Sequence, residues 1–173
     1  MKTCSFLGHR IIEMTPWLIE NIRVCVGQLI ELGVSEFLFG SKSQFVDLCL
    51  KIVDEFKAKF PYIKRVYVRA EYENISESYE KYLLESYDET YFPENIKNAG
   101  KSSYVKRNFE MIEKSDVCVF YYNPSFLPPI KHKKGWGNLI NRPKSGTKIA
   151  FEYATRKNKK IINLFKDFNC LKE

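Results

Sequence analysis

Two short glycine-bearing turns carry residue types that can bind an anion. The first is Cys4-Ser5-Phe6-Leu7-Gly8-His9-Arg10, and the second is Pro143-Lys144-Ser145-Gly146-Thr147. Each turn lies where an apolar strand should end or a helix should begin. In a parallel α/β sheet all such strand ends gather on one edge, where helix N-termini present unpaired N–H groups. The two turns therefore predict a site for a phosphate-bearing small ligand such as a nucleotide.

The first turn offers three groups with different chemistry. Gly8 permits a tight turn or a close approach of the backbone to a ligand. His9 can bond a ligand oxygen or act as an acid or base, because its charge is tunable near neutrality, or it can simply orient the turn. The guanidinium of Arg10 can form a fork onto phosphate or carboxylate, and a surface ion pair is an equally ordinary use for it.

Further candidates follow the other expected strands. The turn after the second strand holds Gly40, Ser41 and Ser43, whose hydroxyls and N–H groups stand at a helix start, although Ser43 can equally serve as a simple N-cap. Tyr121 ends the fourth expected strand, where a ring can stack on a base. Ser145, Gly146 and Thr147 place hydroxyls and backbone donors at the N-terminus of the last helix. Of these turns, that one is the strongest anion-site prediction.

Composition limits the classes of protein to consider. The 173 residues, 45% hydrophobic and 15% aromatic, fit one compact domain over 1–173 with a sizeable core. No apolar run reaches membrane-spanning length, and the N-terminus lacks a signal-peptide pattern. The five cysteines form no C-x-x-C motif, so they are expected to be reduced core thiols of a cytoplasmic protein: Cys4, Cys25, Cys49, Cys118 and Cys170. With only two histidines, no metal site is expected.

Charge is distributed unevenly along the chain. Residues 71–94 contain eight acids against one base, Lys81, whereas the overall formal charge is +7. Residues 123–144 contain four prolines, two glycines and six basic side chains counting His132. A basic segment near a ligand edge attracts phosphates, of a small molecule or of a nucleic acid, although a solvated lysine-rich surface explains most of these side chains. We expect an acidic insertion near 71–100 and a basic loop near 123–144.

The elements that must position these residues follow from apolar periodicity. Buried strands are predicted at 3–7, 36–40, 63–70, 117–121 and 161–165. Helices are predicted after Thr15-Pro16, after Ser43, after Ser102 or Ser103, and around Ile149 to Ala154, with Gly33 ending the first of them. This alternation predicts an α/β fold with a mostly parallel, five-stranded sheet and right-handed crossovers.

The order and spacing of several motifs resemble the YpsA-like branch of the SLOG superfamily. The motifs are the first glycine turn, Phe39-Gly40 with Asp47 in the following helix, Arg107-Asn108-x-x-Met111 leading into Ser115-Asp116, and Ser145-Gly146-Thr147. The resemblance covers most of the chain. It implies a Rossmann-like three-layer sandwich whose C-terminal sheet edge binds nucleotides or nucleotide-derived ligands. No cofactor is expected. Relatives also suggest a homodimer.

The same resemblance leaves the activity open. Some members, such as LOG (lysine-decarboxylase-like) proteins, cleave N-glycosidic bonds, and others sense ligands, whereas DprA binds single-stranded DNA. Arg107 matches the arginine of the LOG-type enzymes, but Ala150 stands where their signature has Glu, and the nearest acid is Glu152. The expected function is therefore nucleotide-ligand binding. The alternatives are an N-glycosidic hydrolase or transferase using Arg107 and Glu152, and single-stranded nucleic-acid binding through the basic loop.

Overall fold

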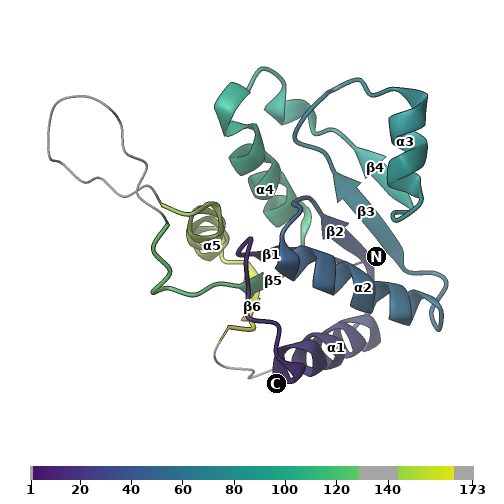
Figure 1. The fold of residues 1–173 in the computed structure, drawn as a ribbon, viewed down its shortest axis with the longest axis vertical. Helices are drawn as coiled ribbons and strands as arrows, with labels where there is room; N and C mark the ends of the chain where they lie inside the picture. The colour runs from purple at the N-terminus through teal and green to yellow at the C-terminus, as the bar shows by residue number, and fades with distance from the viewer. Residues whose placement is uncertain (1, 129–143, 166–173) are drawn as a thin grey trace, which may run out of the picture.

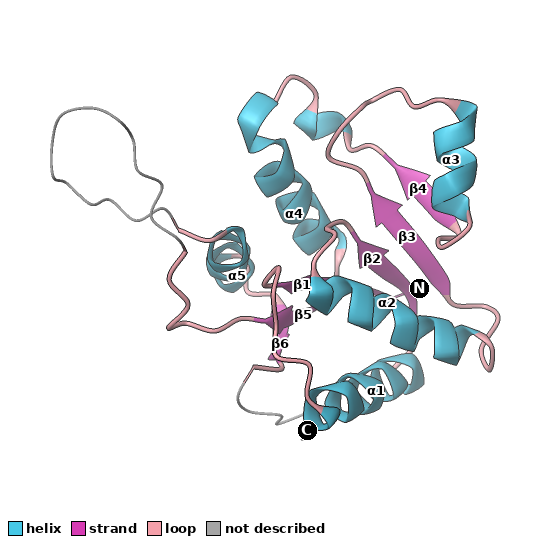
Figure 2. Ribbon diagram, viewed as in Figure 1, coloured by secondary structure: helices cyan, strands magenta, loops and turns pink. Residues whose placement is uncertain are grey.

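A computed structural model describes residues 2–128 and 144–165 of the chain. Its centre is a parallel sheet of six strands in the order β4-β3-β2-β1-β5-β6. The strands are β1 (Lys2–Gly8), β2 (Val34–Phe39), β3 (Lys64–Val68), β4 (Glu89–Tyr91), β5 (Val117–Tyr121) and β6 (Lys160–Asn163). Because every pairing is parallel, all strands end on the same edge, as the arrowheads of β2, β3 and β4 show (Figure 2).

Helices cover both faces of the sheet (Figure 1). The helices α1 (Pro16–Glu31) and α2 (Gln44–Lys57) pack on one face, and α4 (Ser103–Lys114) and α5 (Gly146–Arg156) pack side by side on the other. The short helix α3 (Glu77–Leu84) lies beside β4, and the turns η1 (Glu94–Ile96) and η2 (Gly100–Ser102) precede α4. The protein is thus a three-layer α/β sandwich with a Rossmann-like arrangement, as the sequence predicts.

Alternating side chains along the strands build a separate core on each face. Phe6, Phe37 and Phe39 stack together on the face under α1 and α2. On the other face, Leu7 and Phe120 pack against Ala150 and Ala154 of α5. This alternation is the period of two that a strand imposes on its side chains. The cysteines Cys4, Cys25, Cys49 and Cys118 are buried in these cores, as predicted, and Cys170 lies outside the described residues.

Local signals fix the helix ends. The Thr15 hydroxyl accepts the Leu18 amide at 3.1 Å and caps α1, and Gly33 follows that helix with φ of 88°. The Ser43 hydroxyl accepts the Val46 amide at 3.3 Å and caps α2. The helix α4 starts at the predicted serines, but without a side-chain cap. Ser102 holds the N-cap position, but its hydroxyl donates back to the Ala99 carbonyl at 2.7 Å, because a 3-10 turn runs directly into that helix.

The predicted count of five strands is also wrong. The acidic stretch near 71–100, for which the sequence predicts no strand, contains β4, which pairs with β3 through Tyr67 and Thr90 and extends the sheet by one strand. With three residues, this strand is too short to show a period of two in the sequence. The part of the chain described contains no helix long and apolar enough to cross a membrane.

Candidate functional site

The C-terminal edge of the sheet has a crossover point between β1 and β5. The chain runs from β1 to β2 on one side and returns to β5 on the other, so the two neighbouring strands are connected in opposite directions. In open α/β sheets, ligands bind in the crevice outside such a point. Gly8 at the end of β1 pairs with Tyr121 at the end of β5, which places the first glycine turn at this crevice.

His9 directly follows β1 and lies at the crossover point. The side chain is buried, and its Nε2 accepts a hydrogen bond from the Asn123 amide at 3.0 Å. Burial lowers the pKa of His9, so the ring is neutral at pH 7. Since Nε2 accepts, the proton of the neutral ring is on Nδ1. The ring therefore orients the turn, which is one of the three roles considered for it, and it presents Nδ1 as a hydrogen-bond donor.

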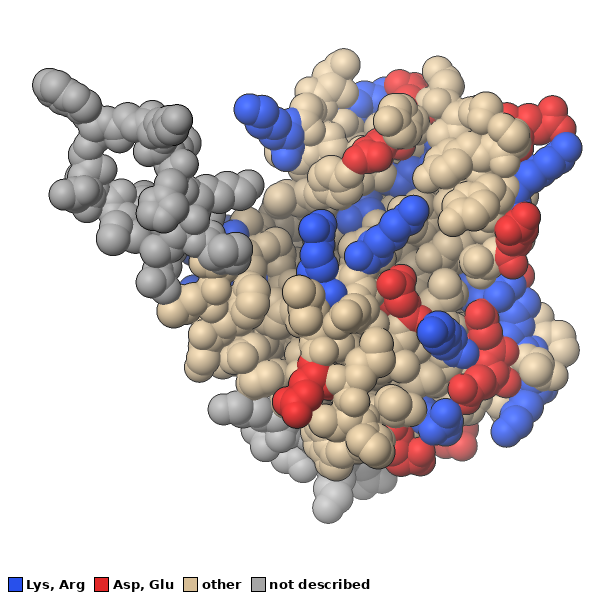
Figure 3. All heavy atoms as spheres, in the orientation of Figure 1, with Lys and Arg blue, Asp and Glu red and all other residues tan. Residues whose placement is uncertain are grey.

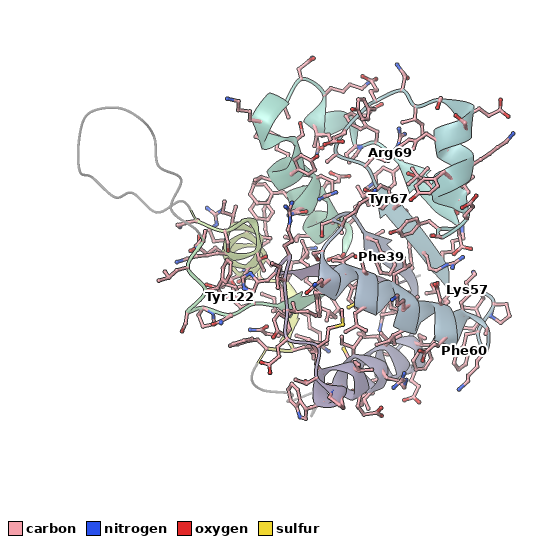
Figure 4. All side chains as sticks on the ribbon, in the orientation of Figure 1. Phe39, Lys57, Phe60, Tyr67, Arg69 and Tyr122 are labelled. Carbon is pink, nitrogen blue, oxygen red and sulfur yellow. The ribbon has the colours of Figure 1, made fainter. Side chains whose placement is uncertain are left out.

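A row of aromatic rings joins the first turn to the last helix. The His9 ring lies 4.4 Å from the ring of Phe126 and 6.0 Å from that of Tyr122. Tyr122 in turn lies 4.6 Å from Phe151, in the second turn of α5, and Figure 4 shows it beside that helix. The ring of Tyr121 faces the opposite way and packs in the core at 5.7 Å from Phe45. Tyr122, and not Tyr121, thus presents its ring on the α5 side of the crevice.

At the N-terminus of α5, the first backbone donors have no acceptor among residues 2–128 and 144–165. Ser145 caps the helix by accepting the Lys148 amide at 3.1 Å, and the Gly146 and Thr147 amides donate to nothing in the described part of the chain. A Cβ added to Gly146 would meet nothing within 4 Å. The start of α5 therefore keeps two backbone donors for an anion, with the positive end of the helix dipole behind them. Pro143, the first residue of that turn motif, lies outside the described residues.

The N-terminus of α2 is less open. The Gln44 amide donates to the Arg10 carbonyl at 3.0 Å, and the Gln44 side chain accepts the Ile12 amide at 3.0 Å. The buried Ser43 hydroxyl is used as the cap, and Ser41 donates to it at 3.4 Å. These contacts tie the first glycine turn to the turn after β2. What remains for a ligand there is the half-buried Ser41 and the exposed Arg10.

Arg107 is one of the most buried side chains of the protein, with 2% of its surface exposed. Its Nη1 donates to the Gly40 carbonyl and, at 3.2 Å, to the Val68 carbonyl, so it bridges the ends of β2 and β3. No carboxylate among the described residues forms an ion pair with it, and burial lowers its pKa to about 10. Arg107 is therefore still charged at pH 7, and its charge lies at the sheet edge without a carboxylate against it.

Gly40 and Gly8 are both needed for close packing at this edge. A Cβ on Gly40 would lie 2.6 Å from the Met111 sulfur and 2.8 Å from Cδ of Arg107. A Cβ on Gly8 would lie 2.6 Å from Cγ of Phe45. Each glycine thus lets a side chain of a neighbouring helix approach the backbone, and neither position leaves room there for a ligand atom.

Glu152 does not join the other candidates. Its carboxylate pairs with Lys144 at 2.7 Å, and its side chain is 41% exposed. The hydrogen bond from Lys144 lowers the pKa of Glu152, which makes it a poorer base. The described carboxylate whose charge acts on Arg107 is instead Glu71, in the loop after β3.

Lys and Arg side chains gather on the surface at this edge of the sheet. Figure 3 shows Lys and Arg side chains in the middle of the visible face, over the start of α2 and the ends of β2 and β3 in the orientation of Figure 1. Acidic side chains lie mainly toward the α3 side and the lower part of the same view. The expected basic loop near 123–144 lies mostly outside the described residues, which end at 128 and resume at 144.

Sequence reasoning missed two of the contacts at this edge. The Asn123 amide that fixes His9 is 114 residues away from it, and a backbone donor has no signature in the sequence. The Val68 carbonyl that accepts from Arg107 is hidden in the same way. The described residues contain no group of His, Cys, Asp and Glu side chains able to hold a metal ion.

The fold and the edge define an α/β protein with a doubly wound, parallel sheet and a polar crossover point. No protein-family model matches the chain, and no curated protein matches it. The likeness to the SLOG superfamily therefore remains a resemblance of motifs.

Proposed function

We propose that this protein binds a nucleotide or a nucleotide-derived ligand at the C-terminal edge of its sheet. The observation that carries the proposal is the buried charge of Arg107 at the ends of β2 and β3, with which no carboxylate of the described residues forms an ion pair. A buried cation without a directly paired carboxylate is costly, so it favours an anion at this edge. An anionic ligand would supply the missing charge without displacing the bonds of Arg107 to Gly40 and Val68.

The start of α5 supplies the phosphate-binding groups in this proposal. The Gly146 and Thr147 amides, with no acceptor in the described residues, suit the oxygens of a phosphate. The neutral His9 adds one donor, and the exposed Arg10 adds a charge that can form a fork. The Tyr122 ring, between His9 and Phe151, offers an apolar surface next to these donors.

The test is ligand-dependent stability. We expect one or more of AMP, GMP, CMP, UMP, NAD and cyclic nucleotides to raise the melting temperature, because a ligand at about 100 times its Kd stabilises the folded state by about 2.7 kcal/mol. Titration calorimetry then gives the Kd. If none of these compounds shifts the melting temperature or gives heat, the proposal is wrong.

A matched pair of variants at one position tests where the phosphate binds. Gly146 is the first residue of α5, where proline is well tolerated, and Ser145 before it has the extended backbone that proline requires. Gly146→Pro removes one N–H donor, and we expect it to weaken nucleotide binding about tenfold, as the loss of about 1.4 kcal/mol would. Gly146→Ala keeps the donor and meets no neighbour within 4 Å, so its affinity should equal that of the wild type.

A further inference from the structure

A separate pocket lies on the same edge, where the chain leaves β3. Its volume is about 440 Å³, within the range of about 300–1,000 Å³ usual for small-molecule sites. It is formed by residues 70–72, in the loop after β3, and by residues 92–104, which run from the end of β4 into the first turn of α4. Ala70, Phe92 and Ile96 supply apolar surface, and of these Ala70 and Ile96 are buried. None of the candidates predicted from the sequence lines it.

Two exposed tyrosines line this pocket from different segments. Tyr72, in the loop after β3, is 70% exposed, and Tyr104, in the first turn of α4, is 51% exposed. Large exposed rings above an apolar floor suit a flat aromatic ligand, since a ring can stack on them without losing hydrogen bonds to water. The carboxylate of Glu71 and the amide of Asn98 add polar groups to the walls. A carboxylate accepts hydrogen bonds, so it suits a ring that carries N–H groups.

The backbone around the pocket is unusual. Tyr72, Asn98 and Gly100, all lining residues, have φ of 56°, 61° and 54°. Asn and Gly adopt this left-handed conformation readily, whereas a bulky residue such as Tyr does so at a cost in stability. Strained residues of this kind cluster at ligand sites. Glycine at position 72 would remove this cost in stability, but it would also remove the ring that lines the pocket.

The pocket is next to the arginine that carries the proposed function. The Tyr104 ring centroid lies 5.8 Å from Cζ of Arg107, and the charge of Glu71 acts on Arg107. Arg69, which Figure 4 places on the loop side of Tyr67, has its Cζ 6.0 Å from the ring of Phe92. Its Nε is buried and has no hydrogen-bond partner among the residues that the structure describes. The pocket therefore adjoins two guanidinium groups.

We infer that this pocket holds the base of the proposed nucleotide, stacked on Tyr72 and Tyr104, and that it favours purines because their larger rings cover more of both side chains. The inference rests on the proposed function for the remainder of the ligand. It assigns base recognition to the segments 70–72 and 92–104, which the acidic stretch contributes, and leaves phosphate binding to the glycine turns.

The experiment compares whole nucleotides with their parts. Titration calorimetry measures the Kd of GMP, AMP, guanosine and ribose 5-phosphate for the wild type and three variants. Tyr104→Leu should weaken GMP and guanosine about tenfold, the loss expected from removing one base–aromatic stack, and leave ribose 5-phosphate unchanged. Tyr82→Leu is the matched control, since Tyr82 is 56% exposed on α3 and does not line the pocket. Its affinities should equal those of the wild type.

Tyr72→Gly separates binding from folding. It removes the ring and relieves the left-handed strain, so it should raise the melting temperature while weakening GMP. A variant that is more stable and yet binds worse cannot owe the loss to misfolding.

The outcomes distinguish this inference from the proposed function. If GMP binds and neither tyrosine variant changes its Kd, the base lies elsewhere, and the inference is overturned while the proposed function stands. A second outcome is that guanosine binds and the tyrosine variants weaken it, while ribose 5-phosphate does not bind and Gly146→Pro leaves the Kd of GMP unchanged. The pocket is then confirmed as a base site, and the proposed nucleotide site with its phosphate-binding turns is wrong. If neither GMP nor guanosine binds the wild type, the inference is wrong as well.

Discussion

Arg107 and Gly40 are in direct contact at the end of β2: Nη1 of the arginine donates to the glycine carbonyl, and its Cδ would lie 2.8 Å from a Cβ at position 40. The arginine of one helix thus closes the end of a strand 67 residues earlier in the chain. This contact explains why the turn has no side chain at that position. It also makes Arg107 part of the sheet edge as well as a candidate for ligand binding.

Gly40→Ala should destabilise the protein. The new methyl group must displace both Arg107 and the Met111 sulfur, and overpacking of this kind costs about 1–3 kcal/mol. Urea unfolding gives the free energy. Gly27→Ala is the control, because it lies inside α1 and its Cβ would meet Phe56 at an ordinary 3.4 Å. That control should be neutral or slightly stabilising. Equal effects of the two substitutions would contradict the contact between Arg107 and Gly40.

Gly8→Ala should be destabilising through one neighbour, the Phe45 ring. For the single variant, we expect the free energy of unfolding to fall by about 1–3 kcal/mol because of overpacking. In a Phe45→Ala background, already weakened by its own cavity, the added methyl group should cost less, because only Cβ of position 45, at 2.8 Å, remains too close to it. A double-mutant cycle by urea unfolding should therefore give a coupling energy of about 0.5–3 kcal/mol. Additive effects of the two substitutions would show that the ring is not what excludes a side chain at position 8.

Acidification should weaken the fold through His9. Burial lowers the pKa of His9 below its usual 6.5, so between the two values the unfolded chain binds more protons than the folded one. The stability due to the neutral ring is complete above about pH 6.5 and is lost as the pH falls through the folded pKa. A protonated Nε2 could no longer accept from the Asn123 amide.

His9→Gln keeps an acceptor for Asn123 but cannot titrate. Melting temperatures measured between about pH 5 and 8 should therefore fall more steeply for the wild type than for this variant. Parallel profiles for the two proteins would rule His9 out as the source of the pH dependence.

Asp88 should make the fold sensitive to stronger acid. Burial by itself raises the pKa of Asp88, but hydrogen bonds from the Arg65 side chain and backbone and from Lys57 outweigh it and bring the pKa to about 2. The carboxylate's contribution is complete above its unfolded pKa of about 3.9 and is lost as the pH falls toward 2. Asp88→Asn should cost about 2–3 kcal/mol at pH 7, as lost bonds between charged groups do, and flatten the acid limb of the stability profile.

The control for Asp88 is Glu77→Gln on α3. Its ion pair with Lys81 joins side chains that are 81% and 73% exposed, so the change should be within about 0.5 kcal/mol. Urea unfolding at a series of pH values measures both variants. An acid limb that is identical in the wild type and in Asp88→Asn would refute the assignment.

An N-glycosidic hydrolase on this edge would use Glu71 and not Glu152. That chemistry needs a carboxylate near the anomeric carbon, and Glu152 is paired with Lys144. Glu71 lines the pocket beside Arg107. With nucleoside monophosphates as substrates, Glu71→Gln should lower the rate of base release at least a hundredfold, in the range of lost acid–base catalysis, and Glu152→Gln should not change it. If Glu152→Gln lowers the rate and Glu71→Gln does not, Glu152 is the catalytic carboxylate, as the sequence suggests. If the wild type releases no base, the protein is not a hydrolase of these substrates.

Much of the fold could be predicted because its signals are local. The apolar runs that became β1 and β5, the Thr15 cap with its following proline, and the stop at Gly33 each depend on neighbours within a few residues. The order of strands and helices then requires a parallel sheet, whose strand ends share one edge. The sequence thereby determined the class of fold and the edge at which the glycine turns lie.

Only the tertiary structure decided what the residues at that edge do. From the sequence, Arg107 is a candidate ligand contact, but in the fold it is buried and donates to the ends of β2 and β3. His9 is held by the Asn123 amide, which follows the end of β5. The strand β4 exists because β3 offers it an edge to pair with, and the pocket exists because the fold brings residues 70–72 and 92–104 together. Burial, register and strain depend on contacts between segments far apart in the chain, and no local pattern records them.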